Sequence, residues 1–268
     1  MRKYLHVVNI GIQNQLVYRI NFLFRAMFGL VPLLATIFLW RTIYRGQGEG
    51  ADVAGYALSQ MISYYLIVTI VNGLTEVNDD DFQIASDIKD GRISQFLLKP
   101  IDFLTYRLCL FGCGRLIYVA VSILPVTLFI WCLREYFVAP ADITTMILFL
   151  VSTFMAALLQ FFISYTMALL AFWILEVSTF IFILFAFEYI ASGQLFPLDI
   201  LPQSMRAFME WTPFFYELFF PVSIYLGRVQ GPELWKGLGI QTIWVLGTYL
   251  LARLVWRQGI KRYAAVGG

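Results

Sequence analysis

Long apolar runs separated by short polar connections dominate the chain. A helix that crosses the roughly 30 Å of bilayer hydrocarbon needs about 20 predominantly apolar residues. Runs of that length predict an all-α membrane protein with about six transmembrane helices in a single transmembrane domain, residues 1–268. The predicted spans are 22–43, 54–76, 108–133, 143–172, 177–193 and 237–257. The fifth is short, and it ends at Gly193 before a stretch that contains several prolines.

Residues 1–20 have a different pattern. Apolar residues recur here at steps of three and four, which places them on one face of a helix. This stripe comprises Leu5, Val8, Ile12, Leu16 and Ile20. An amphipathic helix packed on a soluble domain has the same pattern, but the chain contains no soluble domain of adequate size. We therefore predict an interfacial helix that lies in the membrane plane.

The connection 194–236 interrupts apolar pieces with prolines. Apolar pieces of about 10–14 residues are too short to span and suit re-entrant or interfacial helices. Broken backbone persists at membrane depth only where protein or a water-filled cavity covers it. We therefore expect two short re-entrant helices in this segment. The residues predicted to form its turns are Gly193, Pro197, Pro202 and Pro213.

Charge distribution predicts the orientation. Hydrophobic residues make up 60% of the chain and charged residues 13%, whereas soluble domains carry about 25% charged residues. The net charge of +2 provides no basic field for nucleic acid. Lys and Arg of the connections concentrate in 1–20, in 77–107 and after 256, which favours a multi-pass protein with both termini in the cytoplasm and 194–236 outside. The cysteines and the single histidine lack metal-binding spacing, so no metal site is predicted.

The cytoplasmic loop 77–107 contains a short amphipathic element. Ile84 and Ile88 form an apolar stripe one helical turn apart, Gly91 suits the turn that ends a helix, and Pro100 stops the segment. A second apolar patch comprises Ile93, Phe96 and Leu97. Such a surface must bury itself in lipid headgroups, in the protein's own helices or in a partner protein, and docking into a partner's groove is one established mode. The alternative to docking is an interfacial loop that binds nothing. The residues alone leave both interpretations open.

The run Asp87-Ile-Lys-Asp-Gly-Arg-Ile-Ser-Gln-Phe-Leu-Leu-Lys-Pro100 resembles the cytoplasmic loop of the ABC type-2 permease family. It is most similar to a bacterial drug-exporter-like branch, which carries Ile-x-x-Gly-x-Ile/Leu-x-x-Phe-Leu-Leu-x-Pro after the second span. Gly193-Gln-Leu-Phe-Pro197 and Trp211-Thr-Pro213 resemble the family's external Gly-x-x-Phe-Pro and later proline. The N-terminal segment 1–20 resembles its elbow helix.

The resemblance implies the permease subunit of an ATP-driven ABC exporter that moves hydrophobic or amphiphilic compounds, including drugs, out of the cytoplasm or inner leaflet. It implies cytoplasmic ABC ATPase subunits and a second permease, identical or a sister subunit, as partners in a bacterial cytoplasmic membrane. It also implies that a coupling helix at about 79–98 sits in a groove of the ATPase. The residues assigned to ATPase coupling are Ile84, Asp87, Ile88, Gly91, Arg92, Ile93, Phe96, Leu97 and Pro100.

We expect no enzymatic activity and no bound cofactor in this chain. It contains no Gly-x-x-x-x-Gly-Lys-Ser/Thr run, so it lacks that phosphate-binding loop. ATP and Mg²⁺ are expected on the ATPase partner, and lipids surround the spans.

Glu188, Phe185 and Tyr189 in the fifth span are candidates for a substrate path. Ionisable residues inside spans are functional candidates by default. Glu188 is either a counter-charge for a cationic or polar substrate or a structural hydrogen-bonding group that contacts a neighbouring helix. Arg115, in the third span, either extends toward the cytoplasm or pairs within the bundle.

Other functions stay open. A lipid- or glycan-exporting permease has the same general sequence features, and so does a structural or sensory membrane subunit that transports nothing. An intramembrane enzyme is disfavoured, because the spans carry no paired Asp, Ser/His or His-rich constellation.

Overall fold

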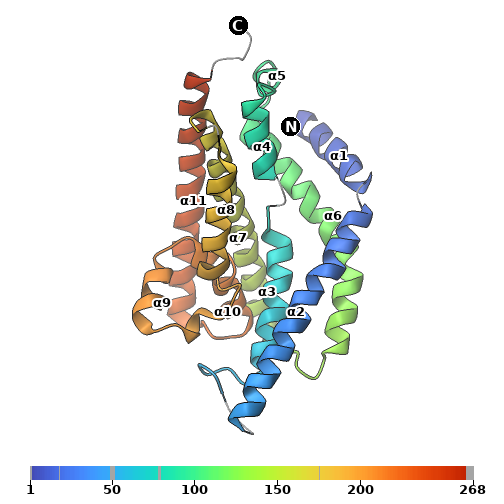
Figure 1. Ribbon diagram of the computed structural model, residues 1–268, viewed down its shortest axis with the longest axis vertical. Coiled ribbons are helices and arrows are strands. Elements are labelled where there is room, and N and C mark those ends of the chain that lie inside the picture. The colour runs from blue at the N-terminus through green and yellow to red at the C-terminus, as the bar shows by residue number, and fades with distance from the viewer. Residues whose placement is uncertain (1, 18, 49–51, 78–79, 175, 264–268) are drawn as a thin grey trace.

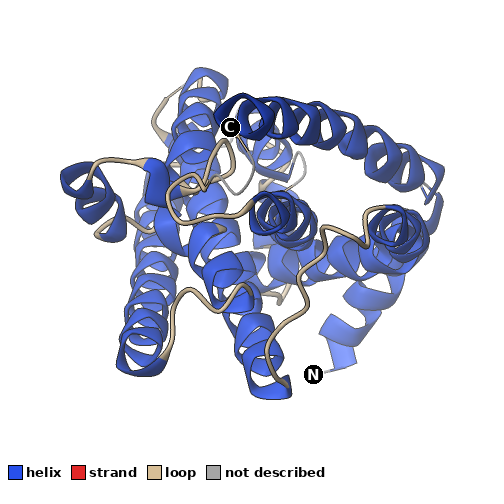
Figure 2. Ribbon diagram, turned by 90° about the horizontal axis from the view of Figure 1, so that it is seen from below, coloured by secondary structure: helices blue, strands red, loops and turns tan. Residues whose placement is uncertain are grey.

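The computed structural model describes residues 2–17, 19–48, 52–77, 80–174 and 176–263 (Figure 1). The described residues form helices and connecting loops with no β-strand, as the view from below also shows (Figure 2). The helices long and apolar enough to cross a bilayer are α2 (Arg19–Gln47), α3 (Leu58–Thr75), α6 (Phe103–Cys132), α7 (Ile143–Leu169) and α11 (Gly231–Arg262). This architecture confirms the predicted all-α membrane protein.

The predicted fifth span is α8 (Ser178–Ala191). With 14 residues and a rise of about 1.5 Å per residue, it is about 21 Å long. It is therefore shorter than the roughly 30 Å hydrocarbon core of a bilayer. The chain turns directly after it at Gly193, which has φ +83°, a backbone conformation that glycine adopts without a steric penalty.

Helices α3 and α7 form the centre of the bundle. Helix α7 packs against α11, α3 and α4 (Asp80–Lys89), and more than half of the α3 residues are buried. In contrast, α2, α6 and α11 leave most of their described apolar side chains at least partly exposed. Water does not solvate such surfaces favourably but lipid does, so these three helices present the faces expected to contact the bilayer.

The lower end of the bundle in Figure 1 contains the segment 194–230. Two short α-helices, α9 (Gln203–Glu210) and α10 (Phe219–Tyr225), form where two were predicted. They are accompanied by the 3₁₀ turns η2 (Leu198–Ile200) and η3 (Phe214–Tyr216). Every residue of α10 is buried, against α7 and α3, whereas α9 has no buried residue. Protein thus covers the broken backbone around α10, as membrane depth requires.

The upper end in Figure 1 contains α1 (Arg2–Val17), α4, α5 (Ser94–Leu97) and the end of α11. Helix α1 packs on α6. Gly11 is its buried residue, and a Cβ there would lie 3.1 Å from the Cys113 Sγ. The predicted apolar stripe is not the packed face, because Leu5 and Leu16 are exposed. That stripe therefore remains available for lipid, while small and polar residues of α1 contact the protein.

Candidate functional site

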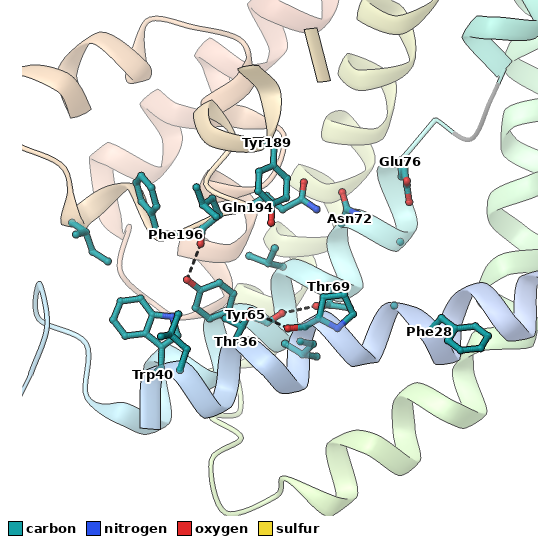
Figure 3. Close-up of a pocket in the computed structure, with 18 of the residues that line it drawn as sticks. Phe28, Thr36, Trp40, Tyr65, Thr69, Asn72, Glu76, Tyr189, Gln194 and Phe196 are labelled. Atoms are coloured by element: carbon teal, nitrogen blue, oxygen red, sulfur yellow. Dashed lines mark hydrogen bonds between the residues drawn. The ribbon is translucent and has the colours of Figure 1, made fainter. Parts of the chain in front are cut away.

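A cavity of about 1130 Å³ lies between α2, α3, α6, α8 and the turn that follows α8 (Figure 3). Phe28 and Trp40, three turns apart on α2, mark its two ends in the close-up. The Tyr65 hydroxyl donates a hydrogen bond to the Leu195 carbonyl at 3.0 Å, which fixes the turn against α3. The cavity is somewhat larger than the roughly 300–1,000 Å³ of ordinary small-molecule sites.

Most of the cavity wall is apolar, and a few polar groups interrupt it. The uncharged polar residues that line it are Thr36, Thr69, Asn72 and Gln194. Glu76 and Arg115 add one charge of each sign. Arg115 donates to the Gly73 carbonyl at 2.9 Å, so it pairs within the bundle, which was one of its two predicted roles. An apolar wall with few polar groups suits an amphiphilic molecule of mixed character.

The three predicted substrate-path residues have different environments. Tyr189 is exposed and lines the cavity. Phe185 and Glu188 are not among the lining residues. Phe185 contacts Phe82 of α4, with ring centroids 6.4 Å apart. The structure therefore retains Tyr189 as a cavity residue and places the other two in contacts between helices.

Glu188 is buried and accepts a hydrogen bond from the Gln160 amide of α7. The fully buried Glu217, at the end of η3, is close enough for its carboxyl to interact with that of Glu188. Because two ionised carboxylates repel each other strongly in an apolar interior, we expect the pair to share a proton. This contact corresponds to the structural alternative for Glu188, a hydrogen bond to a neighbouring helix. Sequence analysis missed Glu217, although a carboxyl within the apolar run 214–226 is a usable signal.

The segment 77–107 is tied to the bundle by a buried ion pair. The Asp87 carboxylate of α4 pairs with Arg107 of α6, and both side chains are buried. Arg92 also donates from its Nε to the Asp87 Oδ1 at 2.9 Å. Asp87 thus joins α4, the following turn and α6.

The residues assigned to ATPase coupling divide into two groups. The buried ones are Ile84, Asp87, Ile88 and Ile93. The others, which are exposed or partly exposed, are Gly91, Arg92, Phe96, Leu97 and Pro100. The side chains of Ile84, Ile88 and Ile93 fill the protein's own core, so they do not form a surface that a partner can reach in this arrangement. The assignment of the segment to ATPase coupling stays a prediction. The exposed apolar residues at this tip are Leu97 and Leu98, the latter 88% exposed.

Further contacts connect this segment to α11. The Tyr263 hydroxyl donates to the Gly91 carbonyl at 3.0 Å and lies 2.8 Å from the Ser94 Oγ. Asp102 caps the start of α6 and pairs with Arg253 of α11. Burial alone would raise the pKa of the Asp102 carboxyl, but hydrogen bonds from Arg253 and Thr105 hold that pKa below its ordinary value. The segment is therefore bonded to α6 and α11 and packs on α7.

The predicted turn residues lie at the lower end. The Tyr64 hydroxyl donates to the carbonyl of the buried Gly193 at 2.6 Å. Pro197 is buried and precedes η2, Pro202 precedes α9, and Pro213 precedes η3. The prolines thus stand immediately before short helical turns, where their fixed φ and missing N–H are tolerated.

A salt-bridge cluster holds the same end together. Asp199 pairs with Arg206 and with the Arg228 Nε, the latter at 3.1 Å. The Tyr56 hydroxyl donates to the Asp199 Oδ2 at 2.7 Å. Arg228 also donates to the Gly55 carbonyl at 3.0 Å. The cluster joins the turn before α3 to the segment after α8, and sequence analysis did not identify it.

The geometry combines a lateral cavity, a short α8 with a covered turn, and a polar segment bonded to several long helices. A comparison with protein families matches residues 30–267 to the model described as an ABC-2 family transporter protein. The chain belongs to the ABC-2 transporter family. The match starts within α2 and includes the 77–107 segment, α11 and all of the cavity lining except Phe28 and Gly29. No curated protein matches the chain significantly.

Membership of the ABC-2 family makes the chain a permease subunit of an ABC transporter. In this family ATP hydrolysis is the work of associated ABC ATPase subunits. The membrane subunit must then contain a path for the substrate and a surface that receives the motion of the ATPase. The cavity of Figure 3 and the upper-end segment are the candidates for these two parts.

Proposed function

We propose that the chain is the permease subunit of an ATP-driven exporter that moves hydrophobic or amphiphilic compounds out of the cytoplasm or inner leaflet of a bacterial cytoplasmic membrane. The observation that carries the proposal is the cavity, which is mainly apolar and lined partly by α2, a helix that leaves most of its described side chains exposed. A compound dissolved in the membrane reaches such a cavity sideways from the lipid. A second permease, identical or a sister subunit, completes the wall around α2 and α8.

The upper end is proposed to face the cytoplasm and to bind the ATPase. Lys and Arg of the connections concentrate in the segments that meet there, which supports this orientation. At its tip Leu97 and Leu98 are exposed side by side. A partner groove that buries them gains roughly 1.5–3 kcal/mol for each leucine.

The ATPase is proposed to push on this tip, and the contacts of the segment 77–107 are proposed to transmit the displacement to the long helices. The Asp87–Arg107 pair passes a displacement to α6, and the Tyr263 hydroxyl passes it to α11. Helix α4 packs directly on α7. Because packed helices move as rigid bodies, a push on the tip reorients three long helices together.

The docking proposal predicts that the Leu97→Asp/Leu98→Asp variant loses the ATPase. Two buried carboxylates replace two buried leucines in the complex, so we expect at least a tenfold weaker association. The amount of ATPase that co-purifies with the tagged permease measures this association. The substitution Phe96→Asp is a poorer test, because the Phe96 ring packs edge-on and tilted against Phe103 and Tyr106 inside the protein.

The matched control for docking is Trp211→Asp, because Trp211 is 82% exposed at the lower end. It places a carboxylate on an exposed apolar position at the proposed opposite side of the membrane. Equal recovery of the ATPase with the double leucine variant and with the parent would refute docking at this tip.

The cavity proposal predicts that Thr36→Trp reduces transport. Thr36 faces the cavity from α2 (Figure 3), so the larger ring fills space that the substrate needs. We expect efflux of a hydrophobic fluorescent drug to fall at least tenfold while the ATPase remains associated. Leu34→Trp is the control, since Leu34 is exposed on the same helix and does not line the cavity. Unchanged efflux in the Thr36 variant would count against this cavity.

The lipid-exporting alternative is favoured by one feature, the exposure of the cavity-lining Phe28 toward the bilayer. Transfer of a fluorescent phospholipid between leaflets, measured in the same proteoliposomes, distinguishes it from drug export. Loss of phospholipid transfer in Thr36→Trp, with drug efflux unchanged, would select the lipid substrate.

A further inference from the structure

A second cavity, of about 690 Å³, lies at the upper end between α1, the α4–α5 connection and the start of α6. Its charged lining residues are Asp87, Arg92, Lys99 and Arg107. Three cations thus face one carboxylate within the wall. Arg107 pairs with Asp87, and Arg92 pairs with both Asp87 and Asp90, the latter at 3.0 Å, so Lys99 carries the excess positive charge beside Arg107.

The two cations at the centre of this excess have unused hydrogen-bonding capacity. Arg107 is 4% exposed, and its Nε has no hydrogen-bond partner in the described part of the chain. The ammonium group of Lys99 lies 4.9 Å from the Phe96 ring centroid, and no described carboxylate pairs with it. A buried donor without a partner, such as the Arg107 Nε, is costly, and the exposed Lys99 ammonium is free to bind an anion, so a bound acceptor would stabilise this arrangement.

Apolar residues occupy the opposite side of the cavity. Val7 and Ile10 of α1 and Leu110 of α6 line it. Ile10 is exposed, as are Leu5 and Leu16 along the same helix. Beyond α1 the exposed apolar surface continues over Ile20 and Leu23 of α2. A polar, basic cavity therefore opens directly onto the surface expected to contact lipid.

We propose that this cavity binds the phosphate headgroup of an anionic glycerophospholipid, whose acyl chains lie along the exposed apolar faces of α1 and α2. Basic pockets beside membrane helices take up such headgroups on the cytoplasmic side. The apolar side of the cavity favours a lipid as the ligand. An acidic segment of a soluble partner would leave Ile10 and its neighbours exposed to water. The bound lipid fastens α1 to the segment that carries Asp87 and Arg107. The proposal rests on the proposed function only for placing the lipid in the cytoplasmic leaflet. The cavity itself does not depend on the ATPase or on the exported compound.

Native mass spectrometry of the purified full chain, without ATPase, tests the site. The probes are phosphatidylglycerol, phosphatidylcholine with the same acyl chains, and inorganic phosphate. We expect phosphatidylglycerol to bind more tightly than phosphatidylcholine, and phosphate alone to bind weakly. Lys99→Gln removes one cation near a headgroup and should weaken phosphatidylglycerol binding about fivefold. Gln95→Glu, which adds a carboxylate to the cavity wall, should weaken it at least as much.

Lys261→Gln is the matched control, because Lys261 is exposed at the same end and does not line this cavity. It should bind phosphatidylglycerol like the parent, and Lys99→Arg should retain binding. If Lys99→Gln and Lys261→Gln weakened phosphatidylglycerol binding equally, the general surface charge would explain the binding, and the site would be overturned. Phosphate binding as tight as phosphatidylglycerol binding would overturn the assignment to a lipid. Because no ATPase is present, either outcome leaves the docking proposal standing on its own test.

Discussion

The Asp87→Ala variant is expected to lose about 3–5 kcal/mol of folding free energy, because it leaves the Arg107 guanidinium buried without its carboxylate. Arg107 is 4% exposed, and Asp87 is the carboxylate that pairs with its guanidinium. The loss corresponds to a shift of two to three orders of magnitude in the unfolding equilibrium. Denaturant titration of the purified protein in mild detergent measures it. Transport should fail as well, because α4 is then detached from α6.

Two companion variants isolate the buried charge as the cause. Asp90→Ala removes an exposed carboxylate three residues away, paired with Arg92, and should cost no more than about 1 kcal/mol. The double variant Asp87→Leu/Arg107→Met replaces the ion pair by apolar side chains and should recover most of the stability. A loss in Asp87→Ala no larger than that in Asp90→Ala would contradict the structural role of the pair.

Gly193→Ala is expected to cost about 2–5 kcal/mol, from two sources. At φ +83° a side chain strains the backbone by roughly 1–2 kcal/mol. A Cβ at this position would also lie 2.7 Å from the Tyr64 hydroxyl oxygen and 3.1 Å from the Phe219 Cβ. Overpacking of this kind costs a further 1–3 kcal/mol or so. The same unfolding titration measures the total.

Gly48→Ala separates the two sources, since Gly48 has φ +97° and no atom within 4 Å of an added Cβ. Gly48→Ala should lose only the part of the unfolding free energy that comes from backbone strain. In the double variant Gly193→Ala/Tyr64→Phe the clash with the hydroxyl is gone, so its cost should be smaller than the sum of the single costs. Equal costs for Gly48→Ala and Gly193→Ala would mean that the turn after α8 is not closely packed.

The sequence was sufficient for the arrangement of long helices, because span length and hydropathy are local properties. The short α8 and its end at Gly193 were predicted for the same reason, and so were the short helices of 194–236. Helix ends were less accurate: α11 starts at Gly231 rather than at residue 237, because Pro232 suits the first turn of a helix.

The direction in which amphipathic segments face was not predictable from their own pattern. Ile84 and Ile88 form the expected stripe, but α7 and its extension η1 (Leu170–Phe172) cover it, so it faces inward. Helix α1 likewise uses Gly11 rather than its apolar stripe to contact α6. In both cases the partner surface comes from residues far away in the chain, which a local periodicity does not contain.

Pairing between distant polar residues was missed for the same reason. Glu188 was recognised as an unusual group, but its contacts with Gln160 and Glu217 depend on how α7 and η3 pack beside α8. Arg107 was counted among the cations of the cytoplasmic loop 77–107, and its role as the buried partner of Asp87 was not predicted. A charged residue at the predicted boundary of a span is therefore better treated as a candidate for an internal ion pair.

The central claim is that force from ATP hydrolysis enters the bundle at the tip formed by Leu97 and Leu98. Its most direct test is photo-crosslinking in intact membranes from a reactive amino acid placed at position 98, with position 211 as the comparison. We predict a crosslink from position 98 to an ATPase subunit, with a yield that changes on addition of ATP, and none from position 211. Crosslinks from position 98 to lipid alone, with the ATPase bound elsewhere or absent, would contradict the account.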